Sequence, residues 1–251
     1  MPDLTVAAAQ SISVAGDVKA NVARHLRLMQ VAAGLGVRFM VFPELSLTGY
    51  EIGRGRELAM RVDDDRLLAL REQAKRSGMT AVAGAPVCAA DGGKVFIGAI
   101  VLGSAGGIAV YTKQHLHPGE DTVFSAGDGG EPVTVGGTGI ALAVCADFSQ
   151  PGHAARAAQS GAGIYAAGVL IGEKGYAADS QLLGGHARRH GMAVLMANHG
   201  GETGGWASAG RSAFWAADGR LVVAAPGVGD SLVIAARKSG HWSGKVVAVQ
   251  I

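Results

Sequence analysis

The chain has 251 residues, of which 49% are hydrophobic and 17% charged, so a sizeable core is expected and disorder is not. Its net charge of +2 comes from scattered lysines and arginines, which argues against nucleic acid or an anionic membrane as a partner. The first residues, Met-Pro-Asp-Leu-Thr-Val, lack the features of a signal peptide, and no apolar run is long enough to span a membrane. We therefore expect a cytoplasmic protein.

Strand-like and helix-like patterns alternate in the first half of the chain. A helix is predicted between Asp17, as its N-cap, and Gly34, and a second over Leu67–Arg76, ended by Gly78. A turn is predicted at Asp91-Gly92-Gly93. The apolar runs that predict strands are Thr5–Gln10, Val37–Phe42, Thr80–Val87, Lys94–Leu102 and Ile108–Thr112.

The second half repeats this style. Strands are predicted at Ile140–Val144, Ile164–Ile171 and Met192–Ala197, and helices at His153–Ser160, starting near Pro151, and Ala177–His190. A hairpin around Asp218-Gly219 and last strands at Ser231–Ala236 and Lys245–Ile251 follow. With no repeat and no linker, the order predicts a single α/β domain over residues 1–251, with mixed sheets.

Three residues that can carry chemistry each follow a predicted strand. Glu44 follows Val37–Phe42, Lys113 follows Ile108–Thr112, and Cys145 follows Ile140–Val144. Ligand sites of α/β folds form beyond the carboxyl ends of strands, so strands running the same way would bring the three together at one edge. A carboxylate can take the proton of a thiol, and a lysine can stabilise the thiolate or an oxyanion. Together they could form and then hydrolyse a thioester.

Three segments carry a resemblance to a known family. They are Phe42-Pro43-Glu44 with Thr48-Gly49-Tyr50, Tyr111-Thr112-Lys113 with Leu116, Glu120, Phe124 and Gly127, and Cys145-Ala146-Asp147 with Pro151. In this order they resemble the three signatures of the nitrilase, or carbon–nitrogen hydrolase, superfamily. Weaker similarities at both ends extend the resemblance along nearly the whole chain.

The resemblance implies a role for each matching residue. Glu44 would be the general base, Lys113 would stabilise the tetrahedral intermediate, and Cys145 would be the nucleophile. The backbone N–H of Ala146 would be a second oxyanion donor, and Glu120 would orient Lys113 and the substrate. The family fold is a four-layer α-β-β-α sandwich with two mixed β-sheets, and homodimers or larger homo-oligomers are common. No metal and no organic cofactor is implied.

The segment after Cys145 bears on the substrate. Cys145-Ala146-Asp147 resembles the amidase and carbamoylase branches, whereas nitrilases more often carry Cys-Trp-Glu. Ala146 and the run Phe148–Gly152 depart from the common pattern at positions that border the pocket. We expect hydrolysis of a small linear amide to an acid and ammonia. Nitrile or N-carbamoyl amine hydrolysis, a glutamine-amide-donating subunit, and a catalytically silent binding or regulatory protein of the same fold remain alternatives.

Other reactive side chains have simpler interpretations. Cys88 lies in a strand-like run and is expected to be structural. His115 and His117 alternate as a metal pair would, but no third ligand is evident nearby. His186 and His190 are four residues apart without the glutamate of a His-Glu-x-x-His motif, so they indicate an ordinary helix face.

Overall fold

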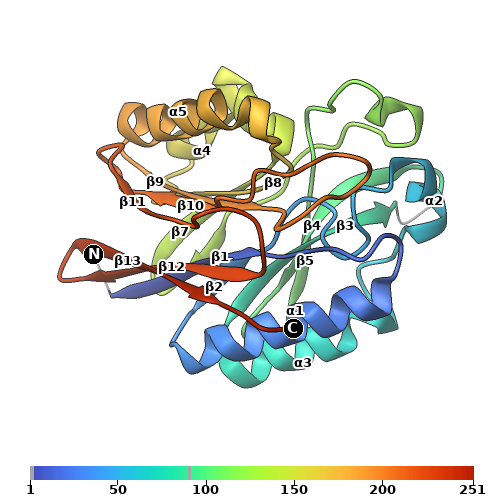
Figure 1. The fold of residues 1–251 in the computed structure, drawn as a ribbon, viewed down its shortest axis with the longest axis horizontal. Coiled ribbons are helices and arrows are strands. Elements are labelled where there is room, and N and C mark those ends of the chain that lie inside the picture. The colour runs from blue at the N-terminus through green and yellow to red at the C-terminus, as the bar shows by residue number, and fades with distance from the viewer. Residues whose placement is uncertain (1–2, 90–91) are drawn as a thin grey trace.

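The computed structural model describes residues 3–89 and 92–251. Met1 and Pro2, at the start of the segment searched for a signal peptide, and Asp91 of the predicted turn lie outside them. Two β-sheets pack face to face, and helices cover the outer face of each (Figure 1). This arrangement is the predicted four-layer α-β-β-α sandwich.

The larger sheet has seven strands in the order β13-β12-β1-β2-β3-β4-β5. Their bounds are β1 Leu4–Gln10, β2 Phe39–Val41, β3 Thr80–Cys88, β4 Val95–Leu102, β5 Ile108–Thr112, β12 Ser231–Lys238 and β13 His241–Ala248. Strands β1, β2 and β3 are parallel and the other pairs are antiparallel, so the sheet is mixed. Because β4 is antiparallel to both β3 and β5, strands β3 and β5 run the same way, and so does β2.

The smaller sheet has six strands in the order β11-β10-β9-β8-β7-β6. Their bounds are β6 Val133–Val135, β7 Thr138–Val144, β8 Ile164–Val169, β9 Ala193–Asn198, β10 Ala213–Trp215 and β11 Leu221–Ala224. Its central strands β7, β8 and β9 are parallel, with antiparallel strands on either side. The predicted hairpin is the antiparallel pair of β10 and β11.

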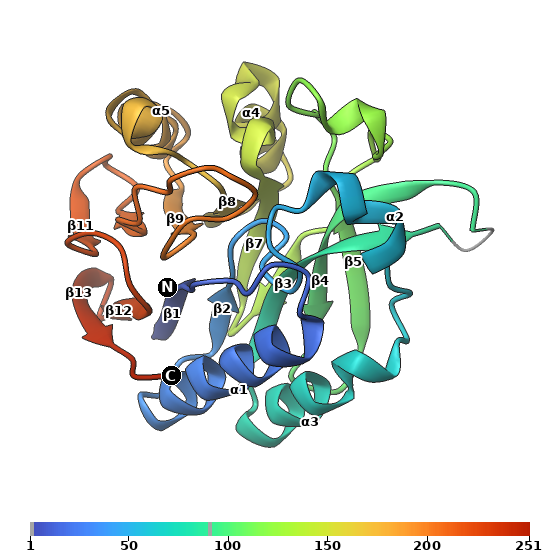
Figure 2. The same ribbon diagram turned by 45° about the vertical axis from the view of Figure 1, so that its right-hand side comes forward.

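Helices α1 (Val18–Gly34) and α3 (Leu68–Ser77) cover the larger sheet, and α4 (Pro151–Gln159) and α5 (Glu173–His190) cover the smaller one (Figure 2). Asp17 caps α1 by accepting a hydrogen bond from Ala20 N at 2.9 Å, and Gly78 ends α3 in a left-handed conformation with φ 61°. The short helices are α2 (Gly55–Leu58), η1 (Ile52–Arg54), η2 (Asp65–Leu67), η3 (Glu120–Thr122) and η4 (Cys145–Ser149).

Three apolar layers hold the sandwich together. One lies between the two sheets and includes Val41, Val144 and Phe214. A second lies under α1 and α3, and a third lies under α4 and α5. Because the central strands are covered on both faces, their continuous apolar runs follow from burial on both sides.

Several predicted boundaries differ from the structure, and the differences at α5, β13 and β2 matter most. Helix α5 begins at Glu173, four residues before the predicted start, after a Gly172 that offers no side-chain cap. Strand β13 spans His241–Ala248 because it pairs antiparallel with the whole of β12, so the predicted strand Lys245–Ile251 begins too late. Strand β2 is only three residues long. Among the helices of the described ranges, none has the length and apolar character needed to cross a bilayer.

Candidate active site

Glu44 lies in a tight segment that the chain can form only because two glycines face it. This segment follows β2 and turns through Leu45, whose φ is 50°. A Cβ atom on Gly84 of β3 would lie 2.3 Å from the carbonyl oxygen of Pro43, and one on Gly168 of β8 would lie 2.5 Å from that of Phe42. Each sheet therefore contributes a glycine that lets the Glu44 backbone pass between them.

Lys113 is fully buried and contacts two carboxylates. Its Nζ lies 2.7 Å from Oε1 of Glu44 and 2.8 Å from Oε1 of Glu120. Glu120 is also fixed by the hydroxyl of Tyr50, which donates to Oε1 at 2.6 Å, and by the backbone N–H of His117, which donates to Oε2 at 2.7 Å. The second oxygen of Glu44, Oε2, is buried and has no hydrogen-bond partner within the described ranges.

Cys145 occupies a strained turn at the end of β7. It is the first residue of η4 and has a φ of 42°, which is uncommon for a residue with a side chain. Its Sγ lies 3.8 Å from the carbonyl oxygen of Leu170. Cys145 and Glu44 line the same small cavity of about 50 Å³, together with Tyr50, His117, Leu170 and Trp206.

Burial and neighbouring charges set the protonation of these groups. Burial raises the pKa of Glu44 to about 7, against the opposing effect of Lys113. Burial and the Glu44 carboxylate also raise the pKa of the Cys145 thiol above its usual range. Burial alone would lower the pKa of Lys113, but Glu44, Cys145 and Glu120 raise it, so the ammonium is retained. The resting site therefore holds a neutral thiol beside a carboxylate that is titratable near neutrality.

The backbone N–H of Ala146 is available to a ligand. It lies in the first turn of η4, where an N–H has no acceptor within the helix, and no hydrogen bond from it is found in the part of the chain that the structure describes. Ala146 is half-buried and lines the same cleft as Cys145. Lys113 Nζ and this N–H are therefore the two candidate donors to a developing oxyanion.

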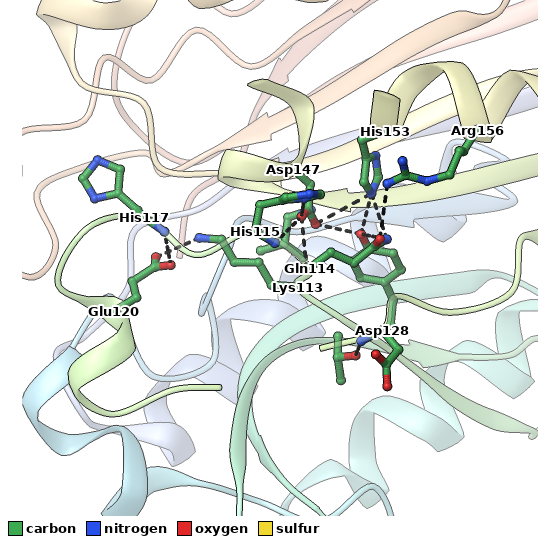
Figure 3. A network of polar contacts seen from close by, with 12 residues as sticks. Lys113, Gln114, His115, His117, Glu120, Asp128, Asp147, His153 and Arg156 are labelled. Carbon is green, nitrogen blue, oxygen red and sulfur yellow. Dashed lines mark hydrogen bonds and ion pairs between the residues drawn. The ribbon is translucent and has the colours of Figure 1, made fainter. Parts of the chain in front are cut away.

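A polar network around Asp147, which lies two residues after Cys145, contacts the segment after Lys113 (Figure 3). At its centre Asp147 accepts hydrogen bonds through Oδ1 from the backbone N–H groups of Gln114 (3.1 Å) and His115 (2.9 Å), and from Nδ1 of His115 (3.0 Å). Its Oδ2 accepts from Tyr111 OH at 2.7 Å and from Val144 N at 3.1 Å. Asp147 belongs to the third signature, where the resemblance assigns it no role, and in the structure it links the ends of β5 and β7.

Two buried histidines, His25 and His199, support the Glu44 segment, and no local sequence pattern indicated either of them. His199 Nε2 donates to the carbonyl oxygen of Glu44 at 2.7 Å. His25 Nε2 lies 2.9 Å from Ser46 Oγ, and its ring stacks on Phe42 at 3.9 Å. Burial lowers the pKa of His199 to about 4 and that of His25 to about 3, so both rings are neutral at pH 7.

A larger cleft of about 600 Å³ opens from Cys145 toward the start of α5. Its walls include Phe148, Ile171, Asp179 and Trp206. Trp206 is 53% exposed and lies edge-on to His117, with ring centroids 6.2 Å apart. The small cavity beside Glu44 and this cleft share Cys145, so a bound molecule could place a reactive group in the first and its remainder in the second.

The remaining reactive side chains have separate surroundings. His115 contacts Asp147, whereas His117 lies against Trp206. His186 and His190 stack on each other, and His186 Nε2 contacts the carbonyl oxygen of Phe148 at 2.8 Å. Cys88 is half-buried at the end of β3. Within the described ranges no group of three or more His, Cys, Asp or Glu side chains has a metal-binding arrangement.

The structure brings the five predicted site residues together, but from two sheets. Glu44 and Lys113 follow parallel strands of the seven-stranded sheet, while Cys145 and Ala146 follow β7 of the six-stranded sheet. Glu120 comes from η3, in the loop beyond β5. The expectation of one common sheet edge thus becomes a site between the ends of two packed sheets.

Comparisons with known proteins agree with this geometry. A model of the carbon-nitrogen hydrolase family matches residues 5–243. The chain is 30% identical over 151 residues to a nitrilase from Pyrococcus abyssi, covering 58% of this chain and 57% of that protein. It is 27% identical over 150 residues to an (R)-stereoselective amidase from a Pseudomonas species, covering 59% and 54%. These alignments span less than two thirds of the curated relatives.

Solved structures show the same fold. An amidase from Nesterenkonia sp. AN1, carrying acrylamide added at its active-site cysteine, superposes with a TM-score of 0.83 at 24% identity and covers 92% of each chain. The same amidase in complex with acrylamide gives a TM-score of 0.85 at 22% identity, covering 95% of this chain and 93% of that one. With the family match across nearly its whole length, the chain belongs to the carbon–nitrogen hydrolase family.

Proposed function

We propose that this protein hydrolyses a small linear amide to a carboxylic acid and ammonia through a thioester on Cys145. One observation carries the proposal. Lys113 binds one oxygen of Glu44, while the other Glu44 oxygen is buried without a partner in the described chain, and Glu44 lines the cavity that Cys145 also lines. A carboxylate with a pKa of about 7 in that position is suited to exchange a proton with a neutral thiol at neutral pH.

The first half of the reaction forms the thioester. The Cys145 sulfur attacks the amide carbon while its proton passes to Glu44, and the carbonyl electrons move to the oxygen. Lys113 Nζ and the N–H of Ala146 would bind that oxyanion. When the C=O bond re-forms, the C–N bond breaks, and the proton on Glu44 passes to the leaving nitrogen, which departs as ammonia.

The second half consumes water. A water molecule loses a proton to Glu44 and attacks the thioester carbon, again with the oxyanion bound by Lys113 and Ala146. Collapse of this intermediate breaks the C–S bond and releases the carboxylic acid. The proton on Glu44 returns to the Cys145 sulfur, which restores the starting site. Glu120 keeps Lys113 in place through its 2.8 Å contact and takes no proton in this scheme.

The relatives carry names that indicate different substrates, so the substrate class of this protein must be tested by experiment. They include an amidase, a nitrilase and an omega-amidase from Danio rerio, the last matched over 97 residues at 33% identity. Cys145-Ala146-Asp147 favours an amide, and nitriles and N-carbamoyl amines are the alternatives that the same three residues could serve.

The test is ammonia release from a panel of short amides, nitriles and N-carbamoyl amines. We expect turnover of amides by the wild type, loss by several orders of magnitude in Cys145→Ala, and retention in the control Cys88→Ala. Intact-mass measurement during turnover should show an acyl adduct on the wild type. Turnover of nitriles alone would replace the proposal with the nitrilase alternative. No turnover, with Cys145 unreactive to iodoacetamide, would favour a binding protein.

A further inference from the structure

Asp179, on the second turn of α5, is a half-buried carboxylate without a partner. It lines the 600 Å³ cleft that opens from Cys145. No hydrogen bond or ion pair joins its side chain to any residue of the described ranges. Burial raises its pKa above the usual range. Its position on the wall of the cleft leaves the carboxylate open to a charged ligand bound there.

The other carboxylates near this cleft are all paired. Glu173, at the start of α5, lies 3.0 Å from the guanidinium of Arg211, and Glu44 and Glu120 share the ammonium of Lys113. Lys174 also lines the cleft, but it is exposed and forms no ion pair with Asp179. The cleft therefore presents one carboxylate that is free to bind a cation.

An aromatic side chain on the wall of the same cleft suits the same ligand. Trp206 closes a tight turn in which Thr203 and Trp206 exchange backbone hydrogen bonds, and Gly204 and Gly205 have φ values of 56° and 76°. Thr203 Oγ1 accepts a hydrogen bond from the backbone N–H of Tyr50 at 2.8 Å, which anchors this turn beside the site. An indole face and a carboxylate are the groups that bind an ammonium ion.

We propose that Asp179 binds a positively charged group of the substrate, so that the preferred substrates are linear amides with a primary ammonium group at the end remote from the carboxamide. This inference rests on the proposed amide hydrolysis. If ammonia is the leaving group, the rest of the substrate is its acyl chain, and the large cleft is the space available to that chain. The small cavity beside Glu44 would then hold the carboxamide.

Matched amides test the proposal directly. A series of ω-amino amides of increasing chain length is compared with neutral amides in which a methyl group replaces the ammonium group. Because a charge-assisted hydrogen bond is stronger than a neutral one, the wild type should favour the best ω-amino amide by roughly 10- to 150-fold in kcat/KM. Asp179→Asn should abolish this preference, because it lowers kcat/KM for the ω-amino amide toward the value for the neutral amide.

Glu173→Gln is the matched control, because it removes a carboxylate of the same helix and cleft that Arg211 already neutralises. It should retain the preference. Equilibrium binding to the Cys145→Ala protein, measured by calorimetry, tests the same point without turnover. There the ω-amino amide should bind at least about tenfold more tightly than its neutral partner, and Asp179→Asn should remove the difference.

The results separate this inference from the proposed function. Turnover of neutral amides without a preference for the ammonium group would overturn the role of Asp179 and leave amide hydrolysis standing. Equal losses on both substrates in Asp179→Asn, with an unchanged unfolding midpoint, would make Asp179 a structural residue of the cleft. Absence of any turnover, with selective binding of ω-amino amides that depends on Asp179, would overturn the hydrolase proposal and keep the cation site.

Discussion

The carboxylate of Asp147 accepts a hydrogen bond from the backbone N–H of His115 at 2.9 Å, and this contact joins the ends of strands from two different sheets. Asp147 lies two residues after Cys145, and His115 lies two residues after Lys113. This buried side chain therefore links the segment that carries the thiol to the segment that carries the ammonium group. No hydrogen bond of either sheet could fix them, because β5 and β7 do not pair.

We expect Asp147→Asn to lower both stability and reactivity. The asparagine side chain has one acceptor oxygen in place of two carboxylate oxygens. If its NH2 group takes the place of Oδ1, it would face the backbone N–H groups of residues 114 and 115, from which it cannot accept a hydrogen bond. Each buried donor left unpaired costs about 1–3 kcal/mol. Urea unfolding should show a loss of at least that size, and the iodoacetamide reaction of Cys145 should change in rate. Asp218→Asn, on an exposed turn, should stay within about 0.5 kcal/mol of the wild type.

The sequence predicted those parts of the fold that local patterns determine. Asp17 caps the start of α1 and Gly78 ends α3, as predicted. The apolar runs that follow these two helices form the central strands β2 and β3. The start of α5 was predicted too late because glycines at 172 and 175 are poor helix signals, although the helix includes Gly175. The short strand β2 is set by pairing with β1 and β3, which are distant in sequence. Strand β6 instead pairs with β7 through the turn Gly136-Gly137, whose φ values are 55° and 73°.

The residues of the site could be predicted from the sequence, but their arrangement in space could not. The resemblance supplied Glu44, Lys113 and Cys145, and their positions after strands suggested that they meet. How they meet depends on the packing of two sheets, on Gly84 and Gly168, and on the buried contacts of His199, none of which leaves a local sequence pattern. Asp179 likewise needs the tertiary structure, because an isolated aspartate in a helix is ordinarily solvated.

Gly168→Ala should disturb the Glu44 segment from the opposite sheet. The new Cβ would lie 2.5 Å from the carbonyl oxygen of Phe42 and 3.3 Å from Glu44 N, so the segment must shift. We expect a stability loss of about 1–3 kcal/mol and a marked fall in kcat. Gly185→Ala is the matched control, because a Cβ there has nothing within 4 Å in α5 and should stabilise the protein by about 0.5–1 kcal/mol. Unchanged kcat in Gly168→Ala would contradict the proposed constraint on Glu44.

The rate of amide hydrolysis should rise with pH and level off near neutrality. Only the deprotonated form of Glu44 can accept the thiol proton, and its pKa is raised to about 7, so kcat/KM should fall about tenfold per pH unit below that value. In Glu44→Gln the rate should drop by orders of magnitude and the residual activity should lose this acidic limb. A wild-type profile that is flat from about pH 5 to 8 would exclude Glu44 as the base that titrates there.

Acid should destabilise the fold through its buried histidines, among which His199 and His25 lie beside the Glu44 segment. The pKa values of His199 and His25 are lowered from 6.5 to about 4 and about 3, so the unfolded chain binds more protons than the folded one below about pH 6.5. Stability present above that pH is therefore lost as the pH falls, by about 1.4 kcal/mol per unit for each histidine. Glu44 acts in the opposite direction between 4.5 and about 7, because its raised pKa favours protonation in the folded state. Burial also lowers the pKa of His153 and His186, so the histidines together outweigh the one carboxylate, and the urea midpoint should decrease on acidification.

His199→Gln keeps a donor for the Glu44 carbonyl oxygen without titrating, and should make the dependence less steep. The exposed His241→Gln should retain the wild-type dependence, and equal slopes in all three proteins would contradict this account.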